Sequence, residues 1–516
     1  MRRREFIKTG TSALLTVPFI LSRPGFAFST SEASPIVTVK DDKAFSLKFR
    51  PGDLPNEDNV IPDKIISTGI DHLRIAQMVD TSILKLTGKN TVGKAWESLF
   101  PAGHPRPDTT IVIKINFSYG NLADRSENTW IKNICPFGPK SAITNAIVAG
   151  LAQMNEGTFP IENITLFDST YLPEKQIDKL IVQGFRPIKA NGLGVYKDSQ
   201  PGAVKMHLAN FLKTWEFSPD TPPFTAAPDY PEKYQAHQRI NSAIYHNDFM
   251  INITHPKDHR AAGITGVMKN MYGCTDNPMG THGWDWNAKD NPYPGTGICV
   301  PVFYKMISRQ TPCILNIIDA MAGLYQGGPL AGKVFQANTL AISRDPVALD
   351  TWELEMINRI RKKNGYSKIT TEDGFTADGH PNASFLRIAA ENHQMGNSSL
   401  QNVREYDISS ATKPYYLPSL QNPLSLLSEV TKTGKDYQVG AIMDRSGRKH
   451  TIRAIIKNTE GDIIKTYKTI VTKSGHKLLR WDHKNDHRVT MPPGLYIWHI
   501  TVDGNLHTGT INDYYV

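Results

Sequence analysis

Hydrophobic residues recur at two different spacings, and these spacings divide the chain into a long mixed region and a C-terminal region of strands. Between residues 71 and 100 the apolar positions follow helical spacing. Gly88 ends the first helix there, and a shorter helix follows at residues 92–100. We expect both helices to pack on a sheet.

Strands and helices then alternate along the chain. Residues 109–116 (TTIVIKIN) form a β-branched run typical of a buried strand, residues 141–154 predict a helix, and residues 164–167 predict the next strand. This order predicts a βαβ unit and therefore a parallel sheet. Further strands are predicted at 248–253, 315–319 and 340–343, and a helix is predicted at 346–361.

The pattern changes after a Ser/Asn/Pro/Lys-rich stretch at residues 397–436. Short, evenly spaced strands separated by turns are predicted at 437–443, 451–457, 463–469, 477–481 and 495–502. Such spacing is typical of a small β-sandwich. The sequence thus predicts an α/β fold, with a parallel or mixed sheet flanked by helices, and a small all-β immunoglobulin-like sandwich at the C-terminus.

Polar residues stand where the predicted buried strands end. Lys114 and Asn116 close the first strand, Asp168 follows the second, and Asp319 ends a later one. Open α/β sheets bind ligands at the carboxyl ends of their strands, so we expect these four residues to line one ligand site. The alternatives are that Lys114 reaches solvent along its apolar stem and that Asp168 caps the segment after it.

The stretch 251–274 (INITHPKDHRAAGITGVMKNMYGC) concentrates charged residues and glycines between apolar runs. Glycine allows a close backbone approach, and a charged residue between buried strands is costly unless it is paired or binds something. We expect the site residues of this stretch to be Lys257, His259, Gly263, Gly266, Lys269 and Asn270. The alternative is a surface loop with solvated lysines.

Four separated motifs carry a resemblance to a known family. They are the segment 257–273 (KDHRAAGITGVMKNMYG), Lys114 with Asn116, IIDA at 317–320 with GGP at 327–329, and SRDPVALD at 343–350. Over residues 70–396 the chain resembles the domain-of-unknown-function 362 family, a resemblance that implies no reaction. In SRDPVALD, Asp345 is expected to cap the helix that begins at Pro346.

The C-terminal strands carry a second resemblance. Trp481 with Asp482, Asp486, and the PPGLY segment at 492–496 resemble the immunoglobulin-like domain of flagellar hook-capping proteins. This resemblance implies an appended structural or docking module.

The N-terminus predicts export. Residues 3–8 (RREFIK) match the twin-arginine pattern, an apolar segment follows at 13–21, and residues 25–27 (GFA) suit cleavage. The apolar segment is too short for a stable membrane span. We therefore expect a signal peptide at 1–27 that engages the twin-arginine translocase, and a location in the periplasm or cell envelope of a bacterium. An N-terminal arm at 28–65, an α/β domain at 66–396, a linker at 397–436 and a sandwich at 437–516 complete the predicted organisation.

Composition excludes some classes of protein. The net charge is +9, but residues 1–27 carry five Lys or Arg against one Glu, which leaves about +5 without a long basic run. A nucleic-acid partner is therefore not indicated. The four cysteines form no C-x-x-C pair, so the sequence has no contiguous iron–sulfur motif, and we expect buried thiols or one or two disulfides.

Two kinds of chemistry fit the candidate residues. A metal ion is one, because the twin-arginine route often carries proteins with inserted cofactors, and His259 with His282 would be its ligands. A helix from Pro256 would bring His255 and His259 to one face, but proline favours an extended His255, so His259 is preferred. The other is proton transfer on a small anionic ligand, in which lysines neutralise a carboxylate or phosphate, glycine amides assist, and a histidine or aspartate moves a proton.

The sequence therefore predicts an exported enzyme, dependent on a metal or another cofactor, that acts on a small anionic substrate by proton transfer or redox chemistry. Its expected catalytic residues are Lys257, His259, Lys269 and Asp168. The alternative is an envelope protein that binds its ligand without turnover.

Overall fold

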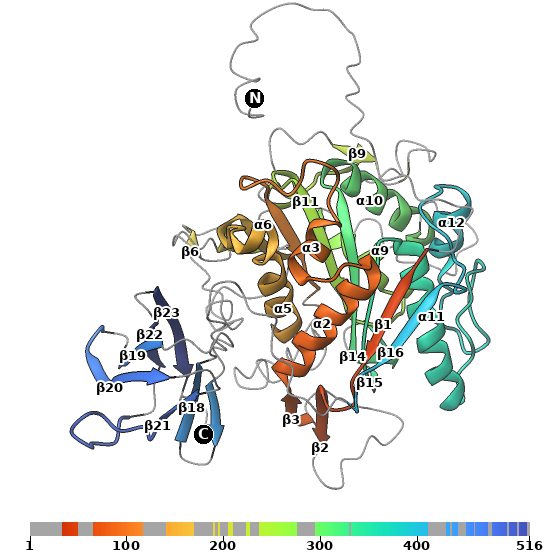
Figure 1. Cartoon of the computed structure of the whole chain (residues 1–516). Coiled ribbons are helices and arrows are strands. Elements are labelled where there is room, and N and C mark those ends of the chain that lie inside the picture. Colours follow the sequence, from red (N-terminus) through yellow and green to blue (C-terminus); the bar gives the residue numbers. More distant parts are fainter. Residues whose placement is uncertain are drawn as a thin grey trace, which may run out of the picture.

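The computed structural model describes most of an α/β region and a set of C-terminal strands (Figure 1). The described residues are 34–49, 65–116, 141–169, 189–190, 195–196, 205–209, 223–225, 227, 237–275, 295–329, 332–410, 430–433, 436–441, 450–458, 460–472, 477–492, 495–502 and 505–512. Within these ranges no helix is long and apolar enough to cross a membrane.

An eight-stranded mixed sheet forms the centre of the α/β region, in the order β16-β1-β15-β14-β11-β4-β5-β8. Its strands are β16 (Val403–Asp407), β1 (Ile36–Lys40), β15 (Lys333–Ser343), β14 (Cys313–Gln326), β11 (Phe249–Thr254), β4 (Ile111–Lys114), β5 (Ile164–Ser169) and β8 (Lys205–Ala209). The five strands from β14 to β8 run parallel, whereas β15 is antiparallel to both β14 and β1. The predicted α/β class with a parallel or mixed sheet is confirmed.

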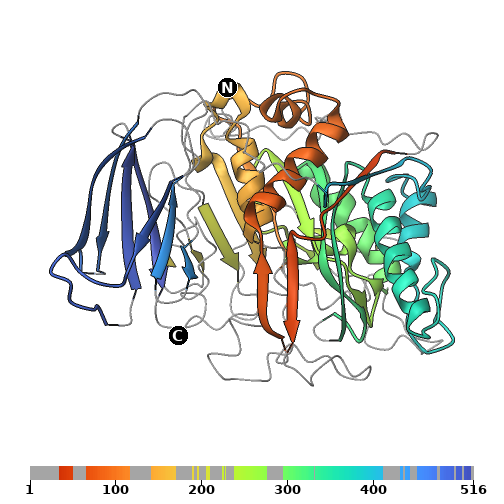
Figure 2. The ribbon, with the colours of Figure 1, turned by 60° about the horizontal axis from the view of Figure 1, so that its bottom comes forward.

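Helices cover both faces of this sheet, as Figures 1 and 2 show. One face carries α2 (His72–Thr87), α3 (Val92–Glu97) and α5 (Ser141–Leu151), and the other carries α9 (Gly266–Asn270), α10 (Thr296–Gln310), α11 (Pro346–Lys363) and α12 (Ser384–Glu391). The buried strand β4 shows the alternation that joins these layers. Ile111 and Ile113 belong to the buried cluster that includes α2 and α5, and Val112 belongs to the cluster that includes α10 and α11. Both faces of β4 are therefore buried, as its unbroken β-branched sequence predicts.

The order of the parallel strands contains one reversal. From β4 the chain moves outward to β5 and β8, and it then returns to place β11 on the other side of β4 and β14 beyond it. The carboxyl ends of β4 and β11 therefore lie side by side where the chain leaves them in opposite directions. Such a topological switch point is where open α/β sheets place their ligand sites.

Several predicted boundaries differ from the structure. The expected N-terminal arm contributes β1 to the main sheet and β2 (Phe45–Phe49) to a hairpin with β3 (Ile65–Ile70), and the expected linker contributes β16. Both segments are polar enough to resemble loops, but β1 pairs on both sides and buries Ile36, Val37 and Val39. The helix considered at Pro256 does not form. A short hairpin of β12 (Asp258–His259) and β13 (Gly263–Ile264) stands there instead.

Two antiparallel sheets make up the described C-terminal strands. One has the order β17 (Val430–Thr433), β18 (Asp436–Ala441), β21 (Lys477–Trp481), and the other has the order β20 (Ile463–Thr472), β19 (His450–Lys457), β22 (Leu495–Val502), β23 (Asn505–Asn512). Trp481 of the first sheet is fully buried, and its ring centroid lies 4.8 Å from that of Tyr496 in the second. The predicted strands are present, and their immunoglobulin-like class stays a prediction.

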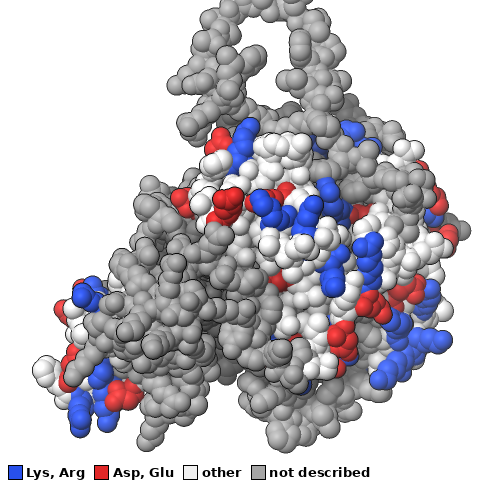
Figure 3. Space-filling view, in the orientation of Figure 1, with Lys and Arg blue, Asp and Glu red and all other residues white. Residues whose placement is uncertain are grey.

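Charged side chains on the described surface are mixed. On the face shown in Figure 3, Asp and Glu lie among the Lys and Arg side chains. Inside the protein, Cys274, Cys299 and Cys313 are buried and outside disulfides, whereas Cys135 lies outside the described residues.

Candidate functional site

Lys114 links two of the strand ends to α9. Its ammonium group donates to Asp168 Oδ1 at 2.8 Å, to Asn270 Oδ1 at 3.2 Å and to the carbonyl of Ile115. Lys114 and Asp168 are 1% and 3% exposed, so the ion pair is shielded from water. Lys114 does not reach solvent, and three of the predicted site residues meet at the carboxyl end of β4.

Buried asparagines extend this contact across the sheet. Asn270 Nδ2 donates to Asn252 Oδ1 of β11 at 2.7 Å, and Asn252 Nδ2 donates to Asn316 Oδ1 of β14 at 3.1 Å. The hydroxyl of Tyr304 in α10 lies within hydrogen-bonding distance of Asn316. Every link ties a different element to the next, so the network fixes Asn270, and through it the position of Lys114.

Lys257 follows β11 and lies at the switch point. Its side chain is 1% exposed, and its Nζ lies 3.4 Å from Asn116 Oδ1 just beyond β4. Burial lowers the pKa of Lys257 from 10.5 to about 7, because a buried ammonium loses its hydration. The charge of Asp168 opposes this shift, and the charge of Lys114 adds to it. A large share of the Lys257 amine is therefore unprotonated at neutral pH.

Lys269 on α9 is a second amine of the same kind. Burial, and then the charge of Lys257, lower the pKa of Lys269 to about 7. Its Nζ lies 4.7 Å from the ring centroid of Tyr272. The two predicted lysines thus influence each other, because protonation of one disfavours protonation of the other.

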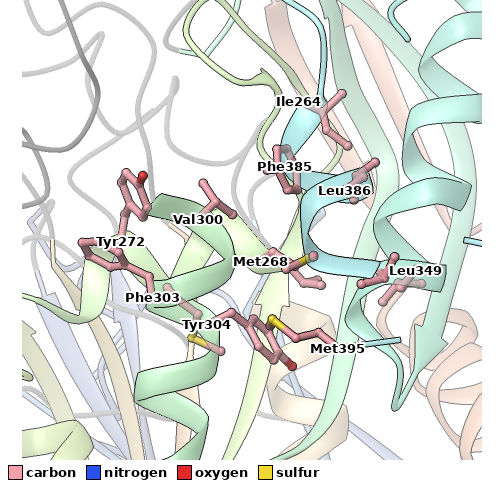
Figure 4. Packing of buried hydrophobic residues seen from close by; sticks show 14 of the residues in the cluster. Ile264, Met268, Tyr272, Val300, Phe303, Tyr304, Leu349, Phe385, Leu386 and Met395 are labelled. Carbon is pink, nitrogen blue, oxygen red and sulfur yellow. The ribbon is translucent and has the colours of Figure 1, made fainter. Parts of the chain in front are cut away.

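The amino end of α9 is held by two carboxyl groups of α11. Val267 N and Met268 N donate to the two oxygens of Asp350 at 2.6 and 3.0 Å, and Gly266 N donates to Glu353 Oε1 at 3.3 Å. Figure 4 shows how Met268 packs beside the side chains of α10 and α11. The amide of Gly266, expected to bind a ligand anion, is therefore bonded to the protein itself, and that expectation is wrong.

Gly263 and Gly266 serve close packing. At Gly266 φ is +62°, and a Cβ there would lie 2.4 Å from the carboxyl carbon of Asp350. At Gly263 φ is +80°, and a Cβ would lie 2.6 Å from the backbone nitrogen of Ala383. Both glycines are needed for the hairpin and α9 to approach α11 and the segment before α12.

Asp258 and His380 hold the hairpin from its other side. Asp258 accepts from Gly328 N at 2.9 and 3.0 Å, and His380 Nε2 lies 3.1 Å from Asp258 Oδ2. His380 Nδ1 lies 2.9 Å from the carbonyl of Pro381, which can only accept, so Nδ1 carries a hydrogen. Both carboxyl oxygens of Asp258, the residue next to Lys257, are therefore held by neighbouring groups.

Two of the predicted residues stand apart from this cluster. Side chains alternate along a strand, so Asp319 shares its face of the sheet with Ile317 and Met321. These two residues belong to the buried cluster that includes α2 and α5, whereas Ile318 belongs to the cluster on the opposite face. The structure does not bring Asp319 to the lysines, and Asp319 Oδ1 accepts from Met321 N at 3.0 Å. The sequence placed it at a strand end, but β14 continues to Gln326.

The histidines give no metal cluster within the described ranges. His259 is 6% exposed, and its Nδ1 accepts from Ala261 N at 3.0 Å. The second expected ligand, His282, lies outside the described residues. Among the residues that the structure describes, no group of three or more His, Cys, Asp or Glu could hold a metal ion.

Sequence reasoning missed Asn252, Asn316, Asp350 and Glu353. The two asparagines sit inside apolar strand runs, where a buried amide requires partners. Asp350 and Glu353 are three residues apart among Val347, Leu349, Leu354 and Ile357. Two acidic residues on the apolar side of a predicted helix were a usable indication of a buried polar contact.

Comparison with known proteins finds one family model that matches the middle of the chain. Residues 131–355 match the model of a family described as Domain of unknown function (DUF362). The matched part of the chain is called the DUF362 region. It includes Asp168, both low-pKa lysines, Asp350 and Glu353, whereas Lys114 and Asn116 precede it.

No curated protein matches this chain. Among solved structures, the chain is similar to dimeric latent PorU from Porphyromonas gingivalis, with 15% identity over 16% of this chain and a TM-score of 0.14. It is also similar to FlgD from P. aeruginosa, with 16% identity over 16% of this chain and a TM-score of 0.11. The chain spans 8% of the former and 62% of the latter.

Proposed function

We propose that the DUF362 region, together with β4, is an enzyme that moves a proton on a small anionic substrate, with the Lys257 amine as the base. One observation carries the proposal: the buried amines of Lys257 and Lys269 have pKa values of about 7 at the switch point of the sheet. A base acts best when its pKa lies near the working pH, and enzymes tune lysines to this range by burial.

The surrounding groups suit such a reaction. An unprotonated amine has a lone pair that can accept a proton from a carbon next to a carboxylate. The ion-paired ammonium of Lys114 and the protonated fraction of Lys269 provide positive charge for the substrate anion. Asn116, within 3.4 Å of Lys257 Nζ, orients the amine. Perturbed lysines at the expected ligand position of a fold are a recognised mark of a functional site.

The cell-envelope setting belongs to the same proposal. We propose that the twin-arginine segment at residues 3–8 exports the folded protein to the periplasm or envelope. The metal or other cofactor expected from this route, with His259 and His282 as ligands, stays a prediction.

Exchange of carbon-bound hydrogen with solvent deuterium tests the function without knowledge of the full reaction. The purified chain is incubated in D₂O with a panel of small carboxylates and phosphorylated carbonyl compounds, and loss of the proton signal is followed by NMR. We expect at least one compound to exchange. Lys257→Met should slow this exchange about 10²–10⁴-fold, the usual contribution of a positioned base.

Lys94→Met is the matched control. The Lys94 side chain is 62% exposed and pairs with Glu97 on α3, so its loss should leave exchange unchanged. Equal exchange by Lys257→Met and the wild type would overturn the assignment of the base. Compounds that bind, as judged by thermal shift, but never exchange would instead support a binding protein without turnover.

A further inference from the structure

Glu353 has two carboxyl oxygens in different surroundings. Oε1 accepts from Lys257 N and Gly266 N, each at 3.3 Å. Oε2 is buried and has no hydrogen-bond partner within the described part of the chain. The whole side chain is 0% exposed, so bulk water does not reach it.

An ionised carboxylate would leave negative charge on Oε2 with no donor to stabilise it. Uncompensated buried charge is among the costliest arrangements in a protein, and such a group takes up a proton instead. A proton on Oε2 leaves Oε1 free to accept from both amides. The geometry therefore distinguishes the two oxygens and selects Oε2 as the one that carries hydrogen.

Asp350, one turn earlier on α11, supports this assignment. Both of its oxygens accept amide hydrogens, so Asp350 is better able than Glu353 to hold negative charge. Burial raises the pKa of Asp350 to about 8, and burial together with the charge of Asp350 raises the pKa of Glu353 well above its usual value. The charged groups that face Glu353 are Asp350 on its own helix and Lys257 from the segment after β11, while α9 presents the amide of Gly266.

We infer that Glu353 is a neutral carboxylic acid at neutral pH, with its proton on Oε2, and that it gives the site an acid beside the Lys257 amine. The Lys257 amine then faces an uncharged acid instead of a carboxylate. The protonation stands on the geometry of Glu353, while any use of that proton in catalysis rests on the proposed function.

Unfolding equilibria of wild type and Glu353→Gln test the protonation. Glutamine keeps an oxygen for the two amides and replaces the O–H by an N–H donor, so it copies the neutral acid. A carboxyl group with a raised pKa in the fold stabilises it at low pH, and this stability is lost as pH rises. We therefore expect the ratio of the wild-type unfolding constant to that of Glu353→Gln to grow about tenfold per pH unit from pH 5 toward neutral pH.

Glu355→Gln, on the same helix, is the control. Its side chain is 41% exposed and pairs with Lys368, so its unfolding constant should run nearly parallel to the wild type. A ratio for Glu353→Gln that does not change with pH would show that Glu353 is ionised in the fold, and the inference would fall.

Carbon NMR of wild-type protein labelled at the glutamate carboxyl carbon gives a second measurement that needs no Glu353 variant. Glu353 is the buried glutamate of the described residues. We expect one glutamate resonance to keep the position of a protonated carboxyl at pH 7, and the lack of such a resonance would also overturn the inference. Neither measurement involves turnover. A protein that retains this proton but exchanges no carbon-bound hydrogen would refute the proposed function alone.

Discussion

The buried amine of Lys257 allows a test of the site that needs no substrate. Replacement by Met keeps most of the length of the unbranched side chain and removes its titratable group. In the unfolded chain Lys257 has its ordinary pKa of 10.5, and in the fold its pKa is about 7. Between these values the unfolded state binds more protons than the folded state, so the free energy of unfolding of the wild type rises with pH.

The size of this rise follows from the two pKa values. A full proton of difference changes the free energy of unfolding by about 1.36 kcal/mol per pH unit. At pH 7 the folded amine is half protonated, and at pH 9 it is almost fully neutral, while the unfolded amine stays protonated. The wild type should therefore gain about 2 kcal/mol over Lys257→Met between pH 7 and pH 9.

Urea unfolding followed by circular dichroism at pH 7, 8 and 9 measures this difference. Lys94→Met serves as the control, because its exposed ammonium is protonated in both states throughout the window. The reasoning fails if the difference between wild type and Lys257→Met stays constant with pH, since the amine would then have an ordinary pKa in the fold. The same substitution should raise the pKa of Lys269, which the charge of Lys257 lowers.

Two further predictions concern the backbone that supports the site. Gly266→Ala should destabilise the protein by about 3 kcal/mol or more, and its control Gly88→Ala by about 1 kcal/mol. Both glycines have positive φ (+62° and +68°), but only at Gly266 would the added Cβ clash with the Asp350 carboxyl group. Equal losses in thermal unfolding would contradict this. Asp345→Ala should cost about 2 kcal/mol, since Asp345 accepts from the first turn of α11, from Asn397 N and from a serine hydroxyl. Thr91→Ala, at a helix start where the side chain makes no capping bond, should cost less than about 0.5 kcal/mol in the same urea assay, and a similar loss for the two would count against the reasoning.

Local pattern was enough to predict the elements that frame the site. The run TTIVIKIN gave β4, and the helix expected from Pro346 begins there, with Asp345 accepting from Ala348 N at 2.9 Å. These features depend on neighbouring residues, which a single sequence displays directly. The meeting of Lys114 with Asp168 followed from one general rule about strand ends.

The remaining features depend on strand order and on contacts between distant segments. The residues around β11 do not indicate that this strand pairs with β4, so the switch point is not predictable from local pattern. The amide of Gly266 was expected to bind a ligand, because the acid that occupies it is 87 residues away. Asp319 is not at a strand end, because the pairing of β14 with β15 continues beyond this polar position to Gln326.

The support of α9 by α11 has a consequence for biosynthesis. The hydrogen bonds from Val267 N and Met268 N reach across 83 and 82 residues to Asp350. A nascent chain that has left the ribosome only as far as β15 contains both lysines but lacks the carboxyl groups that anchor their helix. The lysines can therefore become dry, weakly protonated amines only after α11 is synthesised and docks, so chains truncated before Pro346 should keep lysines of ordinary basicity.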